Sequence, residues 1–167
     1  MRLFEKDSPS ASALLDWWKK LPEHSGDRAA LRRAASVVEA VQVPYTHHLI
    51  STLKDEQAYG DKIAAICGIL SHVRTDNPGQ PFARQMASAR SGSDQPVISN
   101  LRFRRILQYG DITRDILFYQ NTVRIVKNLD SRVNIRDLAE SLYYWGDFTI
   151  KRWAYEYYGT ADNLGDA

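Results

Sequence analysis

Apolar residues recur at spacings of three and four along most of this 167-residue chain, and this periodicity restricts the fold more than any other feature. Such spacing places apolar side chains along one face of an α-helix. No segment alternates polar and apolar residues over the length of a strand, and no Asn-Gly or Asp-Gly pair marks a hairpin. We therefore predict an all-α protein that folds as a compact multi-helix bundle.

Cap residues and helix breakers give the expected boundaries of the helices. The predicted caps are Ser8, Ser25, Ser99, Asp111, Asn134 and Asp147, and Pro44 opens one further helix. The expected helices cover residues 9–20, 26–40, 44–53, 58–73, 82–90, 100–108 and 112–128, a stretch from 135 to Gly146, and a last helix from 147 that stops at Gly159. The buried stripe of the second helix is expected to contain Leu31, Ala34, Ala35, Val38 and Val41, and that of residues 112–128 to contain Ile112, Ile116, Tyr119, Val123 and Val126.

Two stretches rich in turn residues divide the chain. Residues 76–81 read Asp-Asn-Pro-Gly-Gln-Pro, and residues 91–96 read Ser-Gly-Ser-Asp-Gln-Pro, which is typical of a linker. We predict two small helical subdomains that share a core. The predicted division is an N-terminal subdomain over 1–90, a linker over 91–96, a C-terminal subdomain over 97–159 and a frayed tail over 160–167.

Composition excludes several classes of protein. No apolar run approaches the roughly 20 residues that cross a bilayer, and the N-terminus lacks the apolar core of a signal peptide, so we expect no membrane partner and a cytoplasmic location. A single cysteine, Cys67, excludes an intrachain disulfide framework and a cysteine zinc cage.

The sequence contains no recognisable active site. His47 and His48 are adjacent and point about 100° apart on a helix, while His24 and His72 lack metal-ligand spacing. Cys67 lies within an apolar helical stripe, as a buried structural thiol does. No phosphate-binding loop, dinucleotide fingerprint or nucleophile elbow occurs. We predict no catalytic residue, no metal and no cofactor.

The basic residues indicate a polyanionic partner. The chain has 15 Arg and 7 Lys, and residues 102–152 hold ten basic but only six acidic groups. Arg binds phosphate in a bidentate manner, and Arg102 and Arg105 share a face of the predicted helix over 100–108. The alternative is a solvated face whose arginines pair with Asp111 or Asp115.

The aromatic C-terminal region allows two interpretations. A high density of aromatic residues is more typical of a core and a subunit interface than of a base-stacking platform. Residues 135–142 and 147–153 also resemble a helix-turn-helix, although Tyr143 stands where the tight turn favours Gly. The aromatic residues concerned are Tyr143, Tyr144, Trp145, Phe148, Trp153, Tyr155, Tyr157 and Tyr158.

Four stretches together resemble the CasB family, the small subunits of the type I-E CRISPR surveillance complex, Cascade. The string over 101–108, Leu-Arg-Phe-Arg-Arg-Ile-Leu-Gln, resembles a signature of that family. The other stretches are the aromatic helix over 15–21, the basic helix over 26–34 and the closing helices over 133–147 and 152–158. The likeness covers residues 12–158 in the family's order. The helix over 112–128 and the start of the last helix carry fewer cations than is usual in the family.

The resemblance implies an all-helical, non-catalytic subunit that helps to hold a target duplex open. Its implied partners are the guide RNA, the target and displaced DNA strands, the backbone and large subunits of Cascade, and a second copy of itself. Guide pairing would read the sequence, so the protein needs only backbone contacts. The residues expected to contact nucleic acid are Arg28, Arg32, Arg33, Arg102, Arg104, Arg105, Arg124, Lys151 and Arg152.

Two other functions remain open from the sequence. A helix-turn-helix regulator would prefer one specific duplex sequence. A purely structural assembly subunit would dock partners through its aromatic face and use its arginines only in ion pairs.

Overall fold

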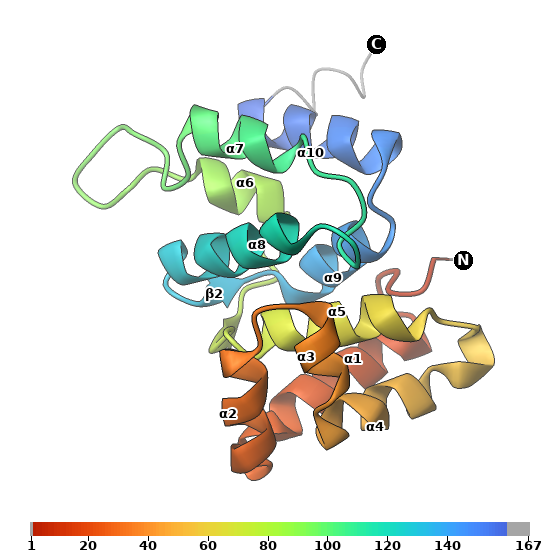
Figure 1. Cartoon of the computed structure of the whole chain (residues 1–167). Helices are drawn as coiled ribbons and strands as arrows, with labels where there is room; N and C mark the ends of the chain where they lie inside the picture. Colours follow the sequence, from red (N-terminus) through yellow and green to blue (C-terminus); the bar gives the residue numbers. More distant parts are fainter. Residues whose placement is uncertain (1, 160–167) are drawn as a thin grey trace.

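The computed structural model describes residues 2–159, and these form helices joined by turns and loops (Figure 1). The all-α class is confirmed. The predicted tail over 160–167 lies outside the described residues. The α-helices are α1 (Pro9–Lys20), α2 (Ser25–Arg33), α3 (Val37–Val41), α4 (Pro44–Thr52), α5 (Gly60–Leu70), α6 (Phe82–Ala87), α7 (Asn100–Ile106), α8 (Ile116–Asn128), α9 (Ile135–Tyr143) and α10 (Asp147–Tyr158), with short 3-10 turns at Leu21–Glu23 and Lys54–Glu56.

Two-residue strands add a small parallel sheet that the sequence did not predict. Strand β1 (Thr75–Asp76) pairs with β2 (Arg132–Val133), with Thr75 opposite Arg132 and Asp76 opposite Val133. The backbone N–H of Asn77 extends the pairing by donating to the carbonyl of Val133 at 2.8 Å. Strands this short carry no alternating pattern, and their pairing joins residues distant in sequence, so periodicity cannot reveal them.

Helix α5 forms the centre of the molecule. Every residue from Ile63 to Leu70 is buried, and α5 packs against α2, α3 and α4 on one side and α8 and α9 on the other. Figure 1 shows α1–α4 gathered on one side of α5 and α6–α10 on the other. The buried apolar residues form one continuous cluster from Leu3 to Tyr157. The two halves therefore share a core.

The loop over 91–96 is exposed and projects from the molecule beside α7 (Figure 1). Its base is held by an antiparallel bridge between Ala89 and Pro96 and by the N–H of Arg90, which donates to the carbonyl of Gln95 at 2.8 Å. Helix α6, which precedes this loop, packs against α10. The division at 91–96 stays a prediction, and the packing of α6 argues for drawing the boundary before Phe82.

The predicted helix over 26–40 is wrong, because the chain breaks it into α2 and α3. Ala34 adopts an extended backbone conformation, with ψ of 124°, and ends α2. The carboxylate of Glu39 then accepts a hydrogen bond from the N–H of Ala35 at 2.7 Å, which stabilises the start of α3 in the manner of a helix cap. The break turns Val38 outward, and this residue of the predicted buried stripe is 72% exposed.

The predicted start of α8 is also wrong. The Asp111 carboxylate accepts hydrogen bonds from the N–H and hydroxyl of Thr113, each at 2.8 Å, and so stabilises a turn. Asp115 is the actual N-cap and accepts from the N–H of Leu117 at 3.2 Å. Ile116 consequently lies at the exposed first position of α8.

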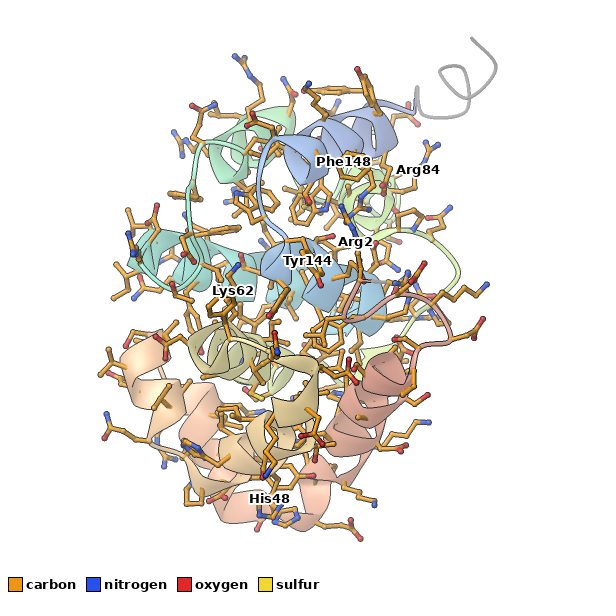
Figure 2. All side chains as sticks on the ribbon, turned by 90° about the vertical axis from the view of Figure 1, so that its right-hand side faces the viewer. Arg2, His48, Lys62, Arg84, Tyr144 and Phe148 are labelled. Carbon is orange, nitrogen blue, oxygen red and sulfur yellow. The ribbon has the colours of Figure 1, made fainter. Side chains whose placement is uncertain are left out.

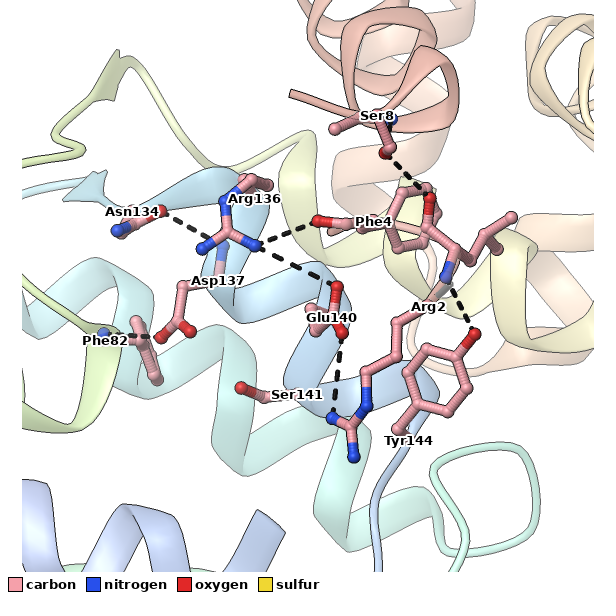
Figure 3. Close-up of polar contacts among 12 residues, drawn as sticks. Arg2, Phe4, Ser8, Phe82, Asn134, Arg136, Asp137, Glu140, Ser141 and Tyr144 are labelled. Atoms are coloured by element: carbon pink, nitrogen blue, oxygen red, sulfur yellow. Dashed lines mark hydrogen bonds and ion pairs between the residues drawn. The ribbon is translucent and has the colours of Figure 1, made fainter. Parts of the chain in front are cut away.

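A polar network ties the N-terminal segment, residues 2–8, to α9 (Figure 3). The Tyr144 hydroxyl accepts from the N–H of Leu3 at 2.8 Å, and the Arg136 guanidinium donates to the Phe4 carbonyl at 2.9 Å. Arg2 lies 3.7 Å from the Glu140 carboxylate and, in Figure 2, between Tyr144 and Phe148. Phe4 is fully buried beneath this network. The segment is therefore part of the folded body.

Candidate nucleic-acid interface

Helix α7 presents three arginines because its other face is anchored in the core. The Ser99 side chain caps the helix, as predicted, by accepting from the N–H of Arg102. Phe103 and Ile106 are buried, and the Phe103 ring stacks on Tyr157 of α10 with the centroids 3.9 Å apart. This anchoring leaves the side chains of Arg102, Arg104 and Arg105 exposed.

A groove of about 430 Å³ runs between α7 and α8, and we call it the basic groove. Four cationic side chains line it, and no carboxylate does. The Arg124 guanidinium donates to the Asn121 side chain at 3.3 Å, which holds it on the wall of the groove. The lining residues are Arg102, Arg105, Ile106, Asn121, Arg124, Ile125, Lys127 and Asn128.

The cations of the groove have no acidic partner in the structure. Among residues 2–159, the ion pairs within 4.0 Å belong to Arg2, Arg136 and Arg152. The alternative in which the arginines of α7 pair with Asp111 or Asp115 is therefore not found. Clustered cations without counterions raise the local positive potential and favour a polyanion.

A second basic group lies on α2. The Arg32 side chain donates to the Ser71 carbonyl at 2.9 Å, and the Nε of Arg28 is buried without a hydrogen-bond partner. Burial, followed by the nearby charges of Arg28 and Arg74, lowers the pKa of Arg32 from its ordinary value. Arg74 thus completes a group of three cations.

His72 lies between the two basic groups. Burial is the main cause that lowers the pKa of His72 to about 4, and the charges of Lys127 and Arg32 add to it. The charges of Lys127 in the basic groove and of Arg32 on α2 therefore both act on the same ring.

Figure 1 shows α2, β2, α8 and α7 following one another along one side of the molecule. We call the exposed and half-buried cations along this side the basic stripe, and they are Arg28, Arg32, Arg74, Lys127, Arg124, Arg102 and Arg105.

The other predicted contact residues lie elsewhere. Arg33, Arg104 and Lys151 are exposed, but none of them lines the basic groove. Arg152 donates to Glu156 at 2.8 Å, to Asp137 at 3.2 Å and to the Ser141 hydroxyl at 2.7 Å. Asp137 and Ser141 belong to α9, so these two bonds hold α10 against α9 and give Arg152 an internal role.

Two cations of the stripe, Lys127 and Arg74, were not among the predicted contacts. Lys127 follows Arg124 by three residues, so helical spacing alone would have placed both on one face of α8. Arg74 had no such signal. It reaches the stripe because its N–H donates to the Ser131 carbonyl at 2.7 Å, beside the pairing of β1 with β2.

The histidines and the cysteine are not grouped as metal ligands in the described residues. No group of three His, Cys, Asp or Glu side chains in residues 2–159 is placed to hold a metal. His24 stacks on Tyr45, and burial raises the pKa of the Cys67 thiol well above its ordinary value. No helix in the same range has the length and apolar character needed to cross a membrane.

The fold and the site define a class: an all-helical protein with a basic groove whose cations have no acidic partner among residues 2–159. The chain belongs to the family of the CRISPR-associated protein Cse2, whose family model matches residues 27–158. Cse2 is the CasB of type I-E systems, so the resemblance inferred from the sequence is confirmed.

A structural comparison gives the same fold. A chain in the crystal structure of Escherichia coli Cascade bound to a PAM-containing double-stranded DNA target matches with a TM-score of 0.69 and 18% identity. The match covers 91% of this chain and 96% of that chain. A search of curated proteins returned no significant match.

Proposed function

We propose that this chain is a non-catalytic small subunit of a type I-E CRISPR Cascade complex, and that its basic stripe contacts nucleic-acid backbone and stabilises the R-loop. The observation that carries the proposal is the basic groove, where four cations gather without a carboxylate. Membership of the Cse2 family and the likeness to a chain of DNA-bound Cascade support it.

The proposed mechanism is electrostatic. Each cation that binds a phosphate releases a counterion, and this gain does not depend on base sequence. Because the exchange of DNA duplex for RNA–DNA duplex is nearly balanced, a few backbone contacts suffice to shift it towards the open state. The subunit therefore needs no catalytic group for this role.

The proposed partners follow from the same role. They are the guide RNA, the target and displaced DNA strands, the backbone and large subunits of the complex, and a second copy of this chain. The proposal places the chain in the cytoplasm together with these nucleic acids. Within the stripe, Arg102, Arg105, Arg124 and Lys127 are the first contacts to test, and Arg28, Arg32 and Arg74 extend the path.

The test removes two groove cations. We expect Arg105→Ala with Arg124→Ala to lower the affinity for single-stranded nucleic acid about tenfold, and to reduce the slope of log affinity against log salt by about 1.4. Fluorescence anisotropy with labelled DNA and RNA strands and with duplex, over a series of salt concentrations, measures both. The matched control is Lys54→Ala with Arg114→Ala, which removes two exposed charges outside the stripe.

The competing functions give different results. If the groove variant and the control bind single-stranded nucleic acid equally well, the arginines of the groove have a role only in assembly of the complex. Strong preference for one duplex sequence would favour a helix-turn-helix regulator. Circular dichroism of both variants checks that the helices remain folded.

A further inference from the structure

Tyr158, near the end of α10, is an exposed aromatic ring that is held rigidly in place. The side chain is 51% exposed, although its hydroxyl donates to the Asn100 side chain on α7. The ring also meets Phe103 edge-on with the centroids 5.9 Å apart, and Tyr157 in the same manner at 5.1 Å. Three contacts thus immobilise one edge of the ring and leave the rest open to solvent.

The neighbouring surface of α7 combines apolar and cationic residues. Leu101 is 59% exposed. Helical spacing places Arg104 one turn from Asn100, on the side of α7 that contacts Tyr158, and places Arg105 one turn from Leu101. Tyr158 and Leu101 therefore lie beside two arginines that have no carboxylate partner within 4.0 Å in the described structure.

We propose that this edge between α7 and α10 is a stacking site for an unpaired nucleobase of a strand whose phosphates bind the basic stripe. The proposal rests on the proposed function and adds a contact with bases to the contacts with backbone. Every base has a π-face, so an aromatic ring binds single strands with little regard to sequence. The unpaired arginines identify an anionic occupant, and a duplex does not fit because its bases already stack on one another.

The rigidity of Tyr158 makes the site effective. A ring that is already ordered by Asn100, Phe103 and Tyr157 loses little conformational freedom when a base stacks on it. Removing one base–aromatic stack weakens binding about fivefold or more. A base on Tyr158 would also place its own phosphates near Arg104, which gives this residue a role outside the basic groove.

The experiment compares two 12-nucleotide strands, one with ordinary bases and one with abasic sites throughout. Their affinities for the full chain are measured by fluorescence anisotropy at low salt. We expect Tyr158→Ala to lower the affinity for the base-bearing strand at least fivefold and to leave the affinity for the abasic strand unchanged. Tyr158→Phe keeps the ring and its packing against Phe103 and loses only the bond to Asn100, so its loss of affinity should be much smaller than that of Tyr158→Ala.

Two controls make the result specific. Tyr59 is an exposed tyrosine in the N-terminal half, and Tyr59→Ala should bind both strands normally. A strand that carries 2-aminopurine reports stacking directly, because its fluorescence is quenched when the base stacks. Quenching should occur with the unmodified chain and with Tyr158→Phe, and be lost with Tyr158→Ala.

Failure of the stacking site is distinguishable from failure of the proposed function. If the groove variant lowers the affinity for both strands but Tyr158→Ala leaves the ratio of the two affinities unchanged, the stacking site is disproved. Binding of the backbone then stands. If neither strand binds, the backbone contact and the stacking site are both disproved for this chain, which then keeps only a role in assembly. Loss of subunit association in Tyr158→Ala, with strand binding unchanged, would make this edge a protein interface instead.

Discussion

His72 is a buried histidine held neutral between cations of the basic stripe. Its side chain is 8% exposed, and burial together with the charges of Lys127 and Arg32 lowers its pKa to about 4. The ordinary value is near 6.5, so between pH 6.5 and pH 4 the unfolded chain binds a proton that the folded chain does not. This histidine therefore makes folding less favourable as the pH falls through that window.

We expect His72→Gln to flatten the pH dependence of stability. Between pH 7 and pH 5, the free energy of unfolding of the unmodified chain should fall by about 1 kcal/mol more than that of the variant, less than full burial would give because solvent screens part of the effect. Urea unfolding at the two pH values measures the difference. Parallel pH profiles would show that the ring does not stay neutral in the folded protein.

Glu140 and Glu156 change the pH dependence of stability in the opposite direction to His72. The effect of His72 is therefore measured as the difference between the unmodified chain and the His72→Gln variant. Burial is the main cause that raises the pKa of each carboxyl, although Arg2 and Arg152 counteract it. A raised pKa means that the folded chain binds the proton first, so acidification through that range favours folding. Both carboxyls are present in the chain and in the His72→Gln variant, and their effects cancel in the difference.

At the scale of elements, the N-terminal segment is attached to α9 by individually weak bonds. The Tyr144 hydroxyl accepts from Leu3 and Arg136 donates to Phe4, while the Ser8 hydroxyl donates to the Leu3 carbonyl within the segment at 3.1 Å (Figure 3). Arg2 adds a contact 5.1 Å above the Tyr144 ring. Because these bonds are few, we expect the segment to open before the rest of the fold.

Tyr144→Phe tests this attachment with the smallest change available. The variant keeps the ring beneath Arg2 and loses only the acceptor for the N–H of Leu3, so the free energy of unfolding should fall by about 1 kcal/mol. Amide exchange in the peptide over 2–9 should accelerate, as measured by mass spectrometry. Tyr59→Phe removes an exposed hydroxyl and serves as control. Unchanged exchange in that peptide would show that Tyr144 does not hold the segment.

Cap residues and helix-ending glycines in the sequence predicted the helix ends that depend only on neighbouring residues. Ser8, Ser99 and Asn134 cap their helices as expected, and Gly159 ends α10 in the left-handed conformation with φ of 73°. One error arose where two local signals competed. Asp111 and Asp115 are both suitable caps, and only the turn at Thr113 decides between them.

At the scale of the whole molecule, the single apolar core makes the two halves depend on each other. Helix α5 belongs to the N-terminal half in sequence, yet it packs against α8 and α9. On the other side, the Tyr143 hydroxyl accepts from the N–H of Tyr59 at 3.0 Å. Neither half can unfold without exposing apolar surface of the other.

We therefore expect one cooperative unfolding transition. Trp17 and Trp18 report on the N-terminal half, and Trp145 and Trp153 on the C-terminal half. With 5-fluorotryptophan in the unmodified chain, the fluorine resonances of all four should lose their native positions at the same urea concentration. Earlier loss at Trp17 and Trp18 would instead support independent subdomains over 1–90 and 97–159.

Only those residues of the candidate site that belong to clusters of charge in the sequence could be predicted. Arg102, Arg105 and Arg124 were expected contacts, and they line the basic groove. Arg152 looked equivalent in sequence, but two of its three internal partners, Asp137 and Ser141, come from α9, which no helical spacing within α10 reveals. Arg74 joins the stripe through β-pairing across more than fifty residues. Contacts of this range depend on tertiary structure.

The pairing of β1 with β2 also bears on the order in which the chain can fold during synthesis. Thr75 leaves the ribosome long before Arg132, its partner in the sheet, and α6, α7 and α8 must be made in between. Until then α5 lacks the helices α8 and α9 that cover it, and its apolar surface stays open to solvent. The N-terminal helices thus keep part of their apolar surface exposed until the C-terminal third of the chain has been synthesised. A nascent chain that stalls before residue 132 would be prone to aggregate.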